Sequence, residues 1–219
     1  MNAERQVFIV DDDARVRESL GLLLQSAGLE VQGFASAEDF LGAHSPGNGC
    51  LIVDISMPSM SGLELQQEIV RAGLSFPVIV ITGHGDVQLA VKAMKAGAVD
   101  FIEKPFDGET LLAGVERALT IGRQLRDRAE EMRAARKALA ALTARERDVL
   151  ERLVRGRPNK VVAYELGISP RTVEIHRARI MSKLRAKSLS DLVRLTIAAA
   201  ESKNTATLDR TPVAASPRT

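Results

Sequence analysis

Cysteine is almost absent from this chain, and long apolar runs are absent altogether. Cys50 is the single cysteine among 219 residues, so no disulfide can form within one molecule. We interpret Cys50 as the first residue of a buried strand. A chain with a single cysteine also fits a reduced, cytoplasmic setting. No apolar run reaches the ~20 residues that a membrane-spanning helix needs, and the start of the chain lacks the pattern of a signal peptide. We therefore expect neither a membrane protein nor a disulfide-stabilised secreted domain.

The net charge of the whole chain is only +2, but this near balance hides two unlike halves. Residues 1–122 hold 8 Lys or Arg against 17 Asp or Glu, a net charge of −9, whereas residues 123–219 hold 22 against 11, a net charge of +11. Such asymmetry predicts two domains with different partners, the basic one facing a polyanion. A plain solvated basic surface is the alternative that charge alone leaves open.

Short β-branched runs alternate with helical patterns in the first half. Predicted strands occupy residues 6–10, 30–34, 50–54, 77–82 and 99–103. Continuous apolar strands that alternate with amphipathic helices indicate a parallel sheet covered on both faces. This pattern predicts an α/β domain at residues 1–121.

Neither glycine nor proline occurs between Gly122 and Gly156. We therefore predict a helical linker at residues 122–141, followed by a compact helical domain at 142–201. Arg128 interrupts an approximate heptad pattern in the linker, so a coiled coil and a single solvated helix both stay open. The tail, residues 202–219, is rich in Thr, Ser, Pro and Ala and is predicted to be disordered.

Polar side chains stand where the predicted strands end. Residues 11–13 are three aspartates after the first strand, Asp54 closes the third, Thr82 closes the fourth and Lys104 follows the fifth. Because the carboxyl ends of parallel strands share one edge, these groups should meet. Clustered carboxylates repel one another, and Mg²⁺, which binds one or two carboxylates with phosphate oxygens and water, would offset that repulsion. We predict a site that handles a phosphoryl group.

The chemistry of this edge would centre on Asp54, which could act as a nucleophile and become an aspartyl phosphate. Lys104 would neutralise the added oxygens, and Thr82 with Phe101 would relay the change to the surface. We interpret His84 as part of the loop that rearranges with Thr82, not as a catalytic base. Each element taken singly has an ordinary alternative as a turn, cap or loop residue. Their joint placement at successive strand ends favours the phosphoryl site.

The basic half contains the order helix, glycine turn, helix. Residues 159–166 have the pattern of a short helix that Gly167 can end, and Ser169-Pro170 supplies a cap and a first-turn proline for the next helix. This order is typical of a helix-turn-helix motif, with a plain helical hairpin as the alternative. The outward face of the second helix would enter the major groove of DNA.

Two kinds of DNA contact are predicted. Glu174 could accept from cytosine and Ile175 could touch a thymine methyl group. Basic side chains are predicted to contact phosphates, namely Lys160, Arg171, Arg179, Lys183 and Lys187. The predicted DNA-binding set is Lys160, Arg171, Thr172, Glu174, Ile175, Ala178, Arg179 and Lys183.

Spaced motifs in this chain resemble those of two-component response regulators of the NarL/FixJ family. They are VDDD at 10–13, DISMPSMSGLEL at 54–65, ITGHGDV at 81–87, GAVDFIEKPF at 97–106 and the stretch TARERDVL to DLVRL at 143–195. The resemblance spans about residues 5–200. It implies a flavodoxin-like receiver domain with a five-stranded parallel sheet, followed by an all-α LuxR/FixJ-type helix-turn-helix domain.

The resemblance also implies roles for individual residues. Asp54 would be phosphorylated by a sensor histidine kinase, with Mg²⁺ held by Asp12 and Asp54 directly, by the Ser56 carbonyl, and by Asp11 through water. Thr82, Phe101 and Lys104 match the switch and phosphate-binding positions. The recognition helix would be about Arg171–Leu184, and the last helix, from about Ser190, would carry dimer contacts. Ser56 and Ser59 stand where FixJ-like loops often carry Arg and Gly, a departure that bears on the lifetime of the phosphorylated state.

We therefore predict a cytoplasmic transcription regulator, an activator, that is not an enzyme acting on external substrates. Phosphorylation should promote homodimerisation through the surface around Val91 and Lys95 and control binding to promoter DNA, with RNA polymerase as a further partner. One alternative is a metal-dependent phosphohydrolase that uses Asp54 as its nucleophile. Such an enzyme would need an acid to protonate the leaving group, but Ser56 lies two residues after Asp54, where that acid would stand. Another is a constitutive DNA-binding protein with a silent receiver, against which the intact acidic set argues.

Overall fold

The computed structural model describes residues 5–43, 48–72, 74, 76–83 and 85–208, with side chains described as far as residue 200. The chain divides into two compact units, Met1–Asp127 and Arg128–Thr219. Each unit contains a hydrophobic core of its own. No helix in the described part of the chain is both long and apolar enough to cross a membrane.

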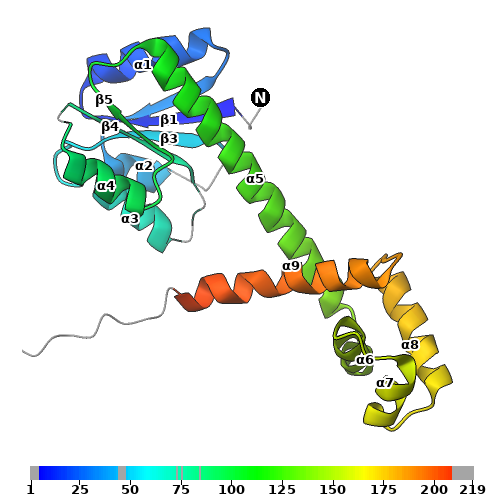
Figure 1. Cartoon of the computed structure of the whole chain (residues 1–219). Coiled ribbons are helices and arrows are strands. Elements are labelled where there is room, and N and C mark those ends of the chain that lie inside the picture. The colour runs from blue at the N-terminus through cyan, green and yellow to red at the C-terminus, as the bar shows by residue number, and fades with distance from the viewer. Residues whose placement is uncertain (1–4, 44–47, 73, 75, 84, 209–219) are drawn as a thin grey trace, which may run out of the picture. The chain divides into compact units, whose positions relative to one another are not determined.

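The first unit is built on a five-stranded parallel sheet, as predicted (Figure 1). Its strands are β1 (Gln6–Val10), β2 (Glu30–Phe34), β3 (Cys50–Asp54), β4 (Val78–Thr82) and β5 (Asp100–Glu103), in the order β2-β1-β3-β4-β5. Strands β3 and β4 are buried at every position. β2 lies on one side of β1, and β3, β4 and β5 follow on the other side. In such sheets the functional crevice lies at the carboxyl ends of the strands, where the strand order changes direction.

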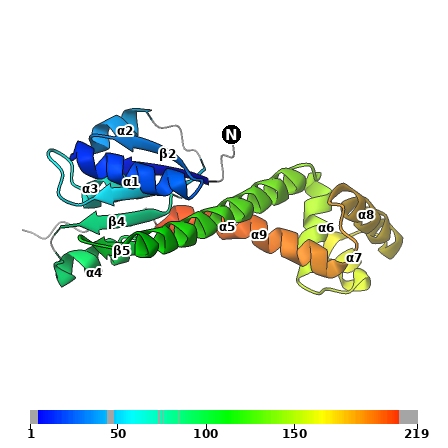
Figure 2. The same cartoon turned by 90° about the horizontal axis from the view of Figure 1, so that it is seen from above.

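Helices cover both faces of this sheet (Figures 1 and 2). They are α1 (Ala14–Ser26), α2 (Ala37–Ala43), α3 (Gly62–Arg71), α4 (Val87–Lys95) and α5 (Gly108–Ala140). Alternate strand residues point to opposite faces. Ile9 and Ile52 therefore pack with α1 and α5, whereas Phe8 and Leu51 pack with α2, α3 and α4.

Cys50 begins β3 and is fully buried, as predicted. Burial raises the pKa of its thiol to about 12, and the charge of Glu116 adds to this effect. A thiol that stays protonated is a poor nucleophile, which argues for a packing role.

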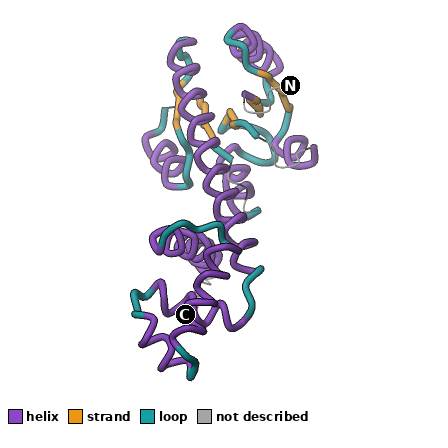
Figure 3. The backbone as a smooth tube through the Cα atoms, turned by 90° about the vertical axis from the view of Figure 1, so that its right-hand side faces the viewer, coloured by secondary structure: helices purple, strands orange, loops and turns teal. Residues whose placement is uncertain are grey.

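The second unit consists of helices and connecting loops in the described residues (Figure 3). Its helices are α6 (Ala144–Val154), α7 (Asn159–Leu166), α8 (Pro170–Lys183) and α9 (Leu189–Leu208), together with the last turns of α5. Ala135 is buried and Leu139 packs against the core that Val149 and Ile180 help to form. The predicted linker is thus helical as far as Ala140, and its last turns belong to the core of the helical unit.

One prediction about the tail is wrong. Helix α9 continues to Leu208, so residues 202–208, predicted to be disordered, are helical. No glycine or proline occurs in this segment before Pro212, so nothing in the backbone chemistry ends the helix earlier. The rest of the predicted disordered tail, residues 209–219, lies outside the described residues.

Candidate functional site

The structure brings the predicted acidic residues to the carboxyl edge of the sheet. Asp11 directly follows β1 and Asp54 is the last residue of β3, and both carboxylates are buried. Strands β1 and β3 are hydrogen-bonded neighbours, with Val10 paired to Val53. Two adjacent parallel strands therefore present their terminal carboxylates side by side.

Lys104 joins the two carboxylates. Its Nζ lies 2.7 Å from Asp54 Oδ1 and 2.9 Å from Asp11 Oδ2. Burial alone would lower the pKa of Lys104, but the hydrogen bonds and charges of Asp54 and Asp11 outweigh it, so the pKa is raised. The ammonium therefore stays charged at neutral pH and supplies the positive charge that paired carboxylates need.

Backbone amides hold the remaining carboxylate oxygens. The Ser56 amide donates to Asp54 Oδ2 at 2.7 Å, and the Asp13 amide donates to Asp11 Oδ1 at 2.8 Å. Arg17 on α1 donates to the Asp11 backbone carbonyl at 2.6 Å. These bonds fix where each carboxylate can point.

The three aspartates of residues 11–13 have separate positions. Asp11 is buried, Asp12 is exposed, and Asp13 caps α1 by accepting from the Arg15 amide at 2.8 Å. Of these three aspartates, Asp12 is therefore the one whose carboxylate is exposed and does not cap a helix. The expected ligand set joins Asp12 and Asp54 with the carbonyl of exposed Ser56.

Thr82 and Phe101 lie on neighbouring strands beside this edge. Thr82 ends β4 and is buried, and its carbonyl accepts from the Lys104 amide at 2.7 Å. Phe101 on β5 is half-buried and packs against the cluster that contains Val80. The backbone thus connects Thr82 directly to the lysine that bonds Asp54. His84 lies outside the described residues.

No preformed cage of three His, Cys, Asp or Glu side chains is found among the residues that the structure describes. Mg²⁺ is normally bound through one or two carboxylates, with waters and phosphate oxygens completing the shell. A structural zinc site would instead need four protein ligands.

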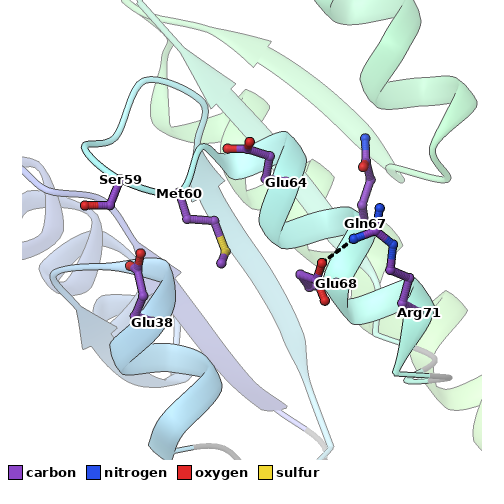
Figure 4. A pocket seen from close by; sticks show the side chains of 7 residues that line it. All are labelled: Glu38, Ser59, Met60, Glu64, Gln67, Glu68 and Arg71. Atoms are coloured by element: carbon purple, nitrogen blue, oxygen red, sulfur yellow. Dashed lines mark hydrogen bonds and ion pairs between the residues drawn. The ribbon is translucent and has the colours of Figure 1, made fainter.

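Surface hollows among the described residues of this domain include the following two. One, of about 540 Å³, is lined by α1 residues such as Val16 and Leu23 and by Lys104 and Phe106. The other, of about 350 Å³, is shown in Figure 4. It is lined by Glu38 of α2, by Ser59 and Met60 of the loop between β3 and α3, and by Glu64, Gln67, Glu68 and Arg71 of α3. Only the first includes a residue of the acidic edge.

The helix-turn-helix prediction is matched element by element. Helix α7 ends at Gly167, which has a left-handed φ of 64°, and Ser169 caps α8 by accepting from the Thr172 amide at 3.1 Å. Val173 and Ile180 bury one face of α8 in the helical core. The other face is thereby turned to solvent.

Most of the predicted DNA-contacting residues lie on that outer face or beside it. The exposed ones are Lys160, Arg171, Glu174, Ile175, Ala178, Arg179 and Lys183, and Thr172 is half-buried. Ile175 is 47% exposed, although an isolated apolar side chain gains nothing from water contact. An exposed isoleucine amid charged neighbours suits contact with a thymine methyl group.

Sequence reasoning missed one buried acid in this unit. Glu146 closes a capping box with Thr143 at the start of α6. Its carboxylate is also buried and lies 2.7 Å from Lys183 Nζ. The capping box is a local sequence pattern, but no local pattern shows that Glu146 pairs with a lysine at the end of another helix.

The predicted dimer surface on α4 is exposed. Val91 is 46% exposed, and Val87 and Met94 on the same helix are exposed too. Lys95 is also exposed. An apolar strip bordered by a lysine is thus available on this helix.

Comparison with known proteins finds a family match for each of the two units. Residues 7–116 match the response regulator receiver domain family, and residues 140–196 match the luxR family of bacterial regulatory proteins. The transcriptional regulatory protein FixJ of Azorhizobium caulinodans is 52% identical over 198 residues, which is 88% of this chain and 92% of that protein. The response regulator protein TodT of Pseudomonas putida is 45% identical over 191 residues, 87% of this chain and 84% of that protein.

A solved structure supports the same assignment. The response regulator StyR is 44% identical, with a TM-score of 0.78, and the match covers 88% of this chain and 98% of that chain. The pairing of these two families describes transcriptional response regulators and not catalytic enzymes, as predicted. The chain belongs to the two-component response regulators in which a receiver domain is joined to a LuxR-type DNA-binding domain.

Proposed function

We propose that Asp54 is the phospho-acceptor through which a sensor histidine kinase controls DNA binding by the helical domain. The observation that carries this proposal is the bridge from Lys104 to Asp54 and Asp11, at 2.7 and 2.9 Å. A cation that already bonds the nucleophile is placed to bond the oxygens of an incoming phosphoryl group.

The transfer itself needs little from the protein beyond positioning. A carboxylate oxygen of Asp54 forms the bond to phosphorus while the bond from phosphorus to the donor nitrogen of a kinase histidine breaks. The Ser56 amide, which bonds Asp54 Oδ2, leaves Oδ1 on the side of Lys104. Lys104 then moves its hydrogen bonding from the carboxylate to the phosphoryl oxygens.

Mg²⁺ fits the donor set as a resident cofactor. We assign Asp12 and Asp54 as direct ligands, the Ser56 carbonyl as a third, and Asp11 as a ligand through water. When bound, the cation would neutralise charge on the phosphoryl oxygens. The exposed position of Asp12 and Ser56 supports entry of a hydrated ion from solvent.

The switch that follows would use Thr82 and Phe101. Because the Thr82 carbonyl bonds the Lys104 amide, a shift of Lys104 toward the phosphoryl group pulls on the end of β4. Phe101 lies on the strand next to β4, in pairing register with Val80. We propose that this movement reshapes the α4 surface around Val91 and Lys95 and thereby favours a homodimer.

The output would be promoter binding through the outer face of α8. Ile175, Glu174 and Ala178 would meet base edges, and Thr172 lies beside them. Lys160, Arg171 and Arg179 would contact phosphates. A dimer would double these contacts with DNA. The protein bound at the promoter would then engage RNA polymerase, and we place this activity in the cytoplasm.

Mass spectrometry of the intact chain tests the phospho-acceptor directly. Incubation with acetyl phosphate and Mg²⁺ should add one phosphoryl group to the wild type and none to Asp54→Asn. Rapid continuous turnover of acetyl phosphate that is lost in Asp54→Asn would favour the phosphohydrolase alternative, in which the phosphoryl group on Asp54 passes quickly to water. Ser56, which stands where such an enzyme would need an acid, argues against that outcome.

A further inference from the structure

The first turn of α6 bonds the ends of other helices in the same unit. Arg145 Nη2 donates to the carbonyl of Leu166, the last residue of α7, at 2.5 Å. Arg147 Nε donates to the Leu142 carbonyl at 3.1 Å and Arg147 Nη2 to the Ala140 carbonyl, at the end of α5, at 3.4 Å. Cationic side chains at the carbonyl ends of helices are stabilising there. This turn is thus fixed to α5 and to the first helix of the helix-turn-helix motif.

The residue between these two arginines bonds the second helix of the motif. Glu146 Oε2 accepts from Lys183 Nζ at 2.7 Å, and Lys183 is the last residue of α8. The same oxygen accepts from the Thr143 backbone amide at 2.8 Å, which completes the capping box. Glu146 therefore connects the start of α6 to the end of α8, 37 residues along the chain.

Burial differs strongly between the two partners. The Glu146 side chain is 4% exposed and that of Lys183 is 38% exposed. A buried carboxylate without a counter-charge is costly, whereas an exposed ammonium is readily hydrated. Glu146 therefore needs Lys183 more than Lys183 needs Glu146, and this holds the lysine against the protein.

The charge of Glu146 is stable at neutral pH. The hydrogen bond from Lys183, with those from Thr143, holds the pKa of Glu146 down at about 2. Within the described residues, Arg171 and Arg179 of the same helix form no comparable ion pair. Lys183 thus differs from the basic residues that face solvent on α8.

We propose that Glu146 is a positioning residue for DNA binding, which fixes recognition helix α8 to the first turn of α6 through Lys183. Lys183 then serves this ion pair and does not neutralise a DNA phosphate. The inference rests on the proposed role of α8 as the helix that reads DNA.

The test measures the affinity of the full chain for DNA as a function of salt. The probe is a duplex selected from a randomised pool by the wild type in the presence of beryllofluoride and Mg²⁺. Fluorescence anisotropy at several KCl concentrations would compare Glu146→Gln, Lys183→Met and the double variant with the wild type. Glutamine is itself a capping-box residue, so Glu146→Gln removes the charge and keeps the cap.

Positioning and phosphate contact predict different results. If Glu146 positions α8, each single variant weakens binding roughly tenfold, the double variant is no weaker than either, and the salt slope is unchanged. If Lys183 instead contacts a phosphate, Lys183→Met lowers the slope by about 0.9 and Glu146→Gln leaves binding equal or tighter. The latter pattern overturns the inference. Lys160→Met, as the matched control, should lower the slope by about 0.9.

Two further comparisons between variants keep the test decisive. Should Lys183→Met unfold the helical unit, Glu146→Gln decides alone, because weaker binding at an unchanged slope supports the inference and unchanged binding overturns it. Ile175→Ala reports separately on the role of α8. If Ile175→Ala and Arg171→Met leave affinity and sequence selectivity intact, the recognition helix itself is wrongly assigned. If they reduce selectivity and Glu146→Gln does nothing, only the positioning role fails.

Discussion

One ammonium group, that of Lys104, lies 2.7 Å from Asp54 Oδ1 and 2.9 Å from Asp11 Oδ2. The three residues come from the ends of β1, β3 and β5 and meet only because those strands are parallel members of one sheet. The bridge balances two buried negative charges in the resting protein. It also keeps a cation within reach of whatever is added to Asp54.

Removing this cation should destabilise the receiver domain. Lys104→Met leaves two buried carboxylates facing each other, and we expect the free energy of unfolding to fall by about 3 kcal/mol, the lower end of the range for removing one partner of a buried ion pair. Urea unfolding followed by circular dichroism, in buffer without divalent cations, measures this loss. Lys92→Met, an exposed lysine on α4, is the matched control and should change stability by less than about 0.5 kcal/mol. Equal unfolding midpoints for the two variants would contradict the role given to Lys104.

Added Mg²⁺ should stabilise the wild-type receiver, and chelation should reverse the gain. Above the dissociation constant, the free energy of unfolding rises by about 1.4 kcal/mol for each tenfold increase in Mg²⁺. Asp12→Asn and Asp54→Asn should flatten this dependence, since each removes a proposed ligand. Asp39→Asn, an exposed acid on α2, should leave it unaltered. A full Mg²⁺ response in both ligand variants would place the cation elsewhere.

Gly62 should be required for the position of Asp54. A Cβ added at Gly62 would lie 2.3 Å from the Asp54 carbonyl oxygen, so Gly62→Ala must displace the loop or the end of β3. We expect phosphorylation by acetyl phosphate to slow about ten- to hundredfold, because small misplacements of reacting groups cost that much. Phosphate-affinity electrophoresis over time measures the rate.

Gly21 provides the control for that substitution. It lies inside α1, and an added Cβ would meet nothing within 4 Å. Gly21→Ala should therefore stabilise the domain by about 0.5–1 kcal/mol and leave the phosphorylation rate alone. Similar rates for the two alanine variants would show that the close approach at Gly62 has no bearing on Asp54.

Much of this site could be predicted because strand ends and apolar periodicity are local signals. A run such as residues 50–54 indicates a buried strand, and its last residue must then stand at the sheet edge. The bridge from Lys104 to both carboxylates was not predictable, because it depends on how side chains from three strands meet. The same holds for Glu146 and Lys183, whose pairing depends on the packing of α6 against α8.

Helix limits were harder to predict than strand ends. Composition suggested a disordered tail from residue 202, yet helical hydrogen bonding continues to Leu208. Ala138 and Leu139 were assigned to a linker, although they pack against the core of the helical unit. Where a helix continues without a break, the residue at which one domain ends depends on tertiary contacts, which local patterns do not contain.

The stability of the helical unit should depend on pH through Glu146. Its pKa is about 2 in the folded chain, below the value of 4.5 that an unperturbed glutamate has. A depressed pKa contributes stability that is complete above pH 4.5 and is lost as the pH falls toward 2. The melting temperature of Glu146→Gln should therefore lie below that of wild type at pH 6, and the difference should shrink as the pH is lowered. Calorimetry of the two full-length proteins tests this, and a difference independent of pH would refute it.

The surface of α4 should govern self-association. Val91→Asp places a charge on an exposed apolar strip, and Lys95→Glu reverses the charge beside it. We expect either change to weaken the beryllofluoride-induced dimer at least tenfold, as measured by sedimentation velocity. Val70→Asp, which alters an exposed valine on α3, serves as the control. Intact dimerisation in both α4 variants would move the interface to another surface.

The central claim is that a phosphoryl group on Asp54 controls DNA binding, and one titration tests it most directly. Fluorescence anisotropy would measure the affinity of the full chain for the selected duplex, with Mg²⁺, with and without beryllofluoride, in wild type and in Asp54→Asn. We expect at least tenfold tighter binding for the wild type on adding beryllofluoride and no change for the variant. Equal affinity for the wild type in both conditions, or the same gain in Asp54→Asn, would show that a phosphoryl group on Asp54 does not control DNA binding.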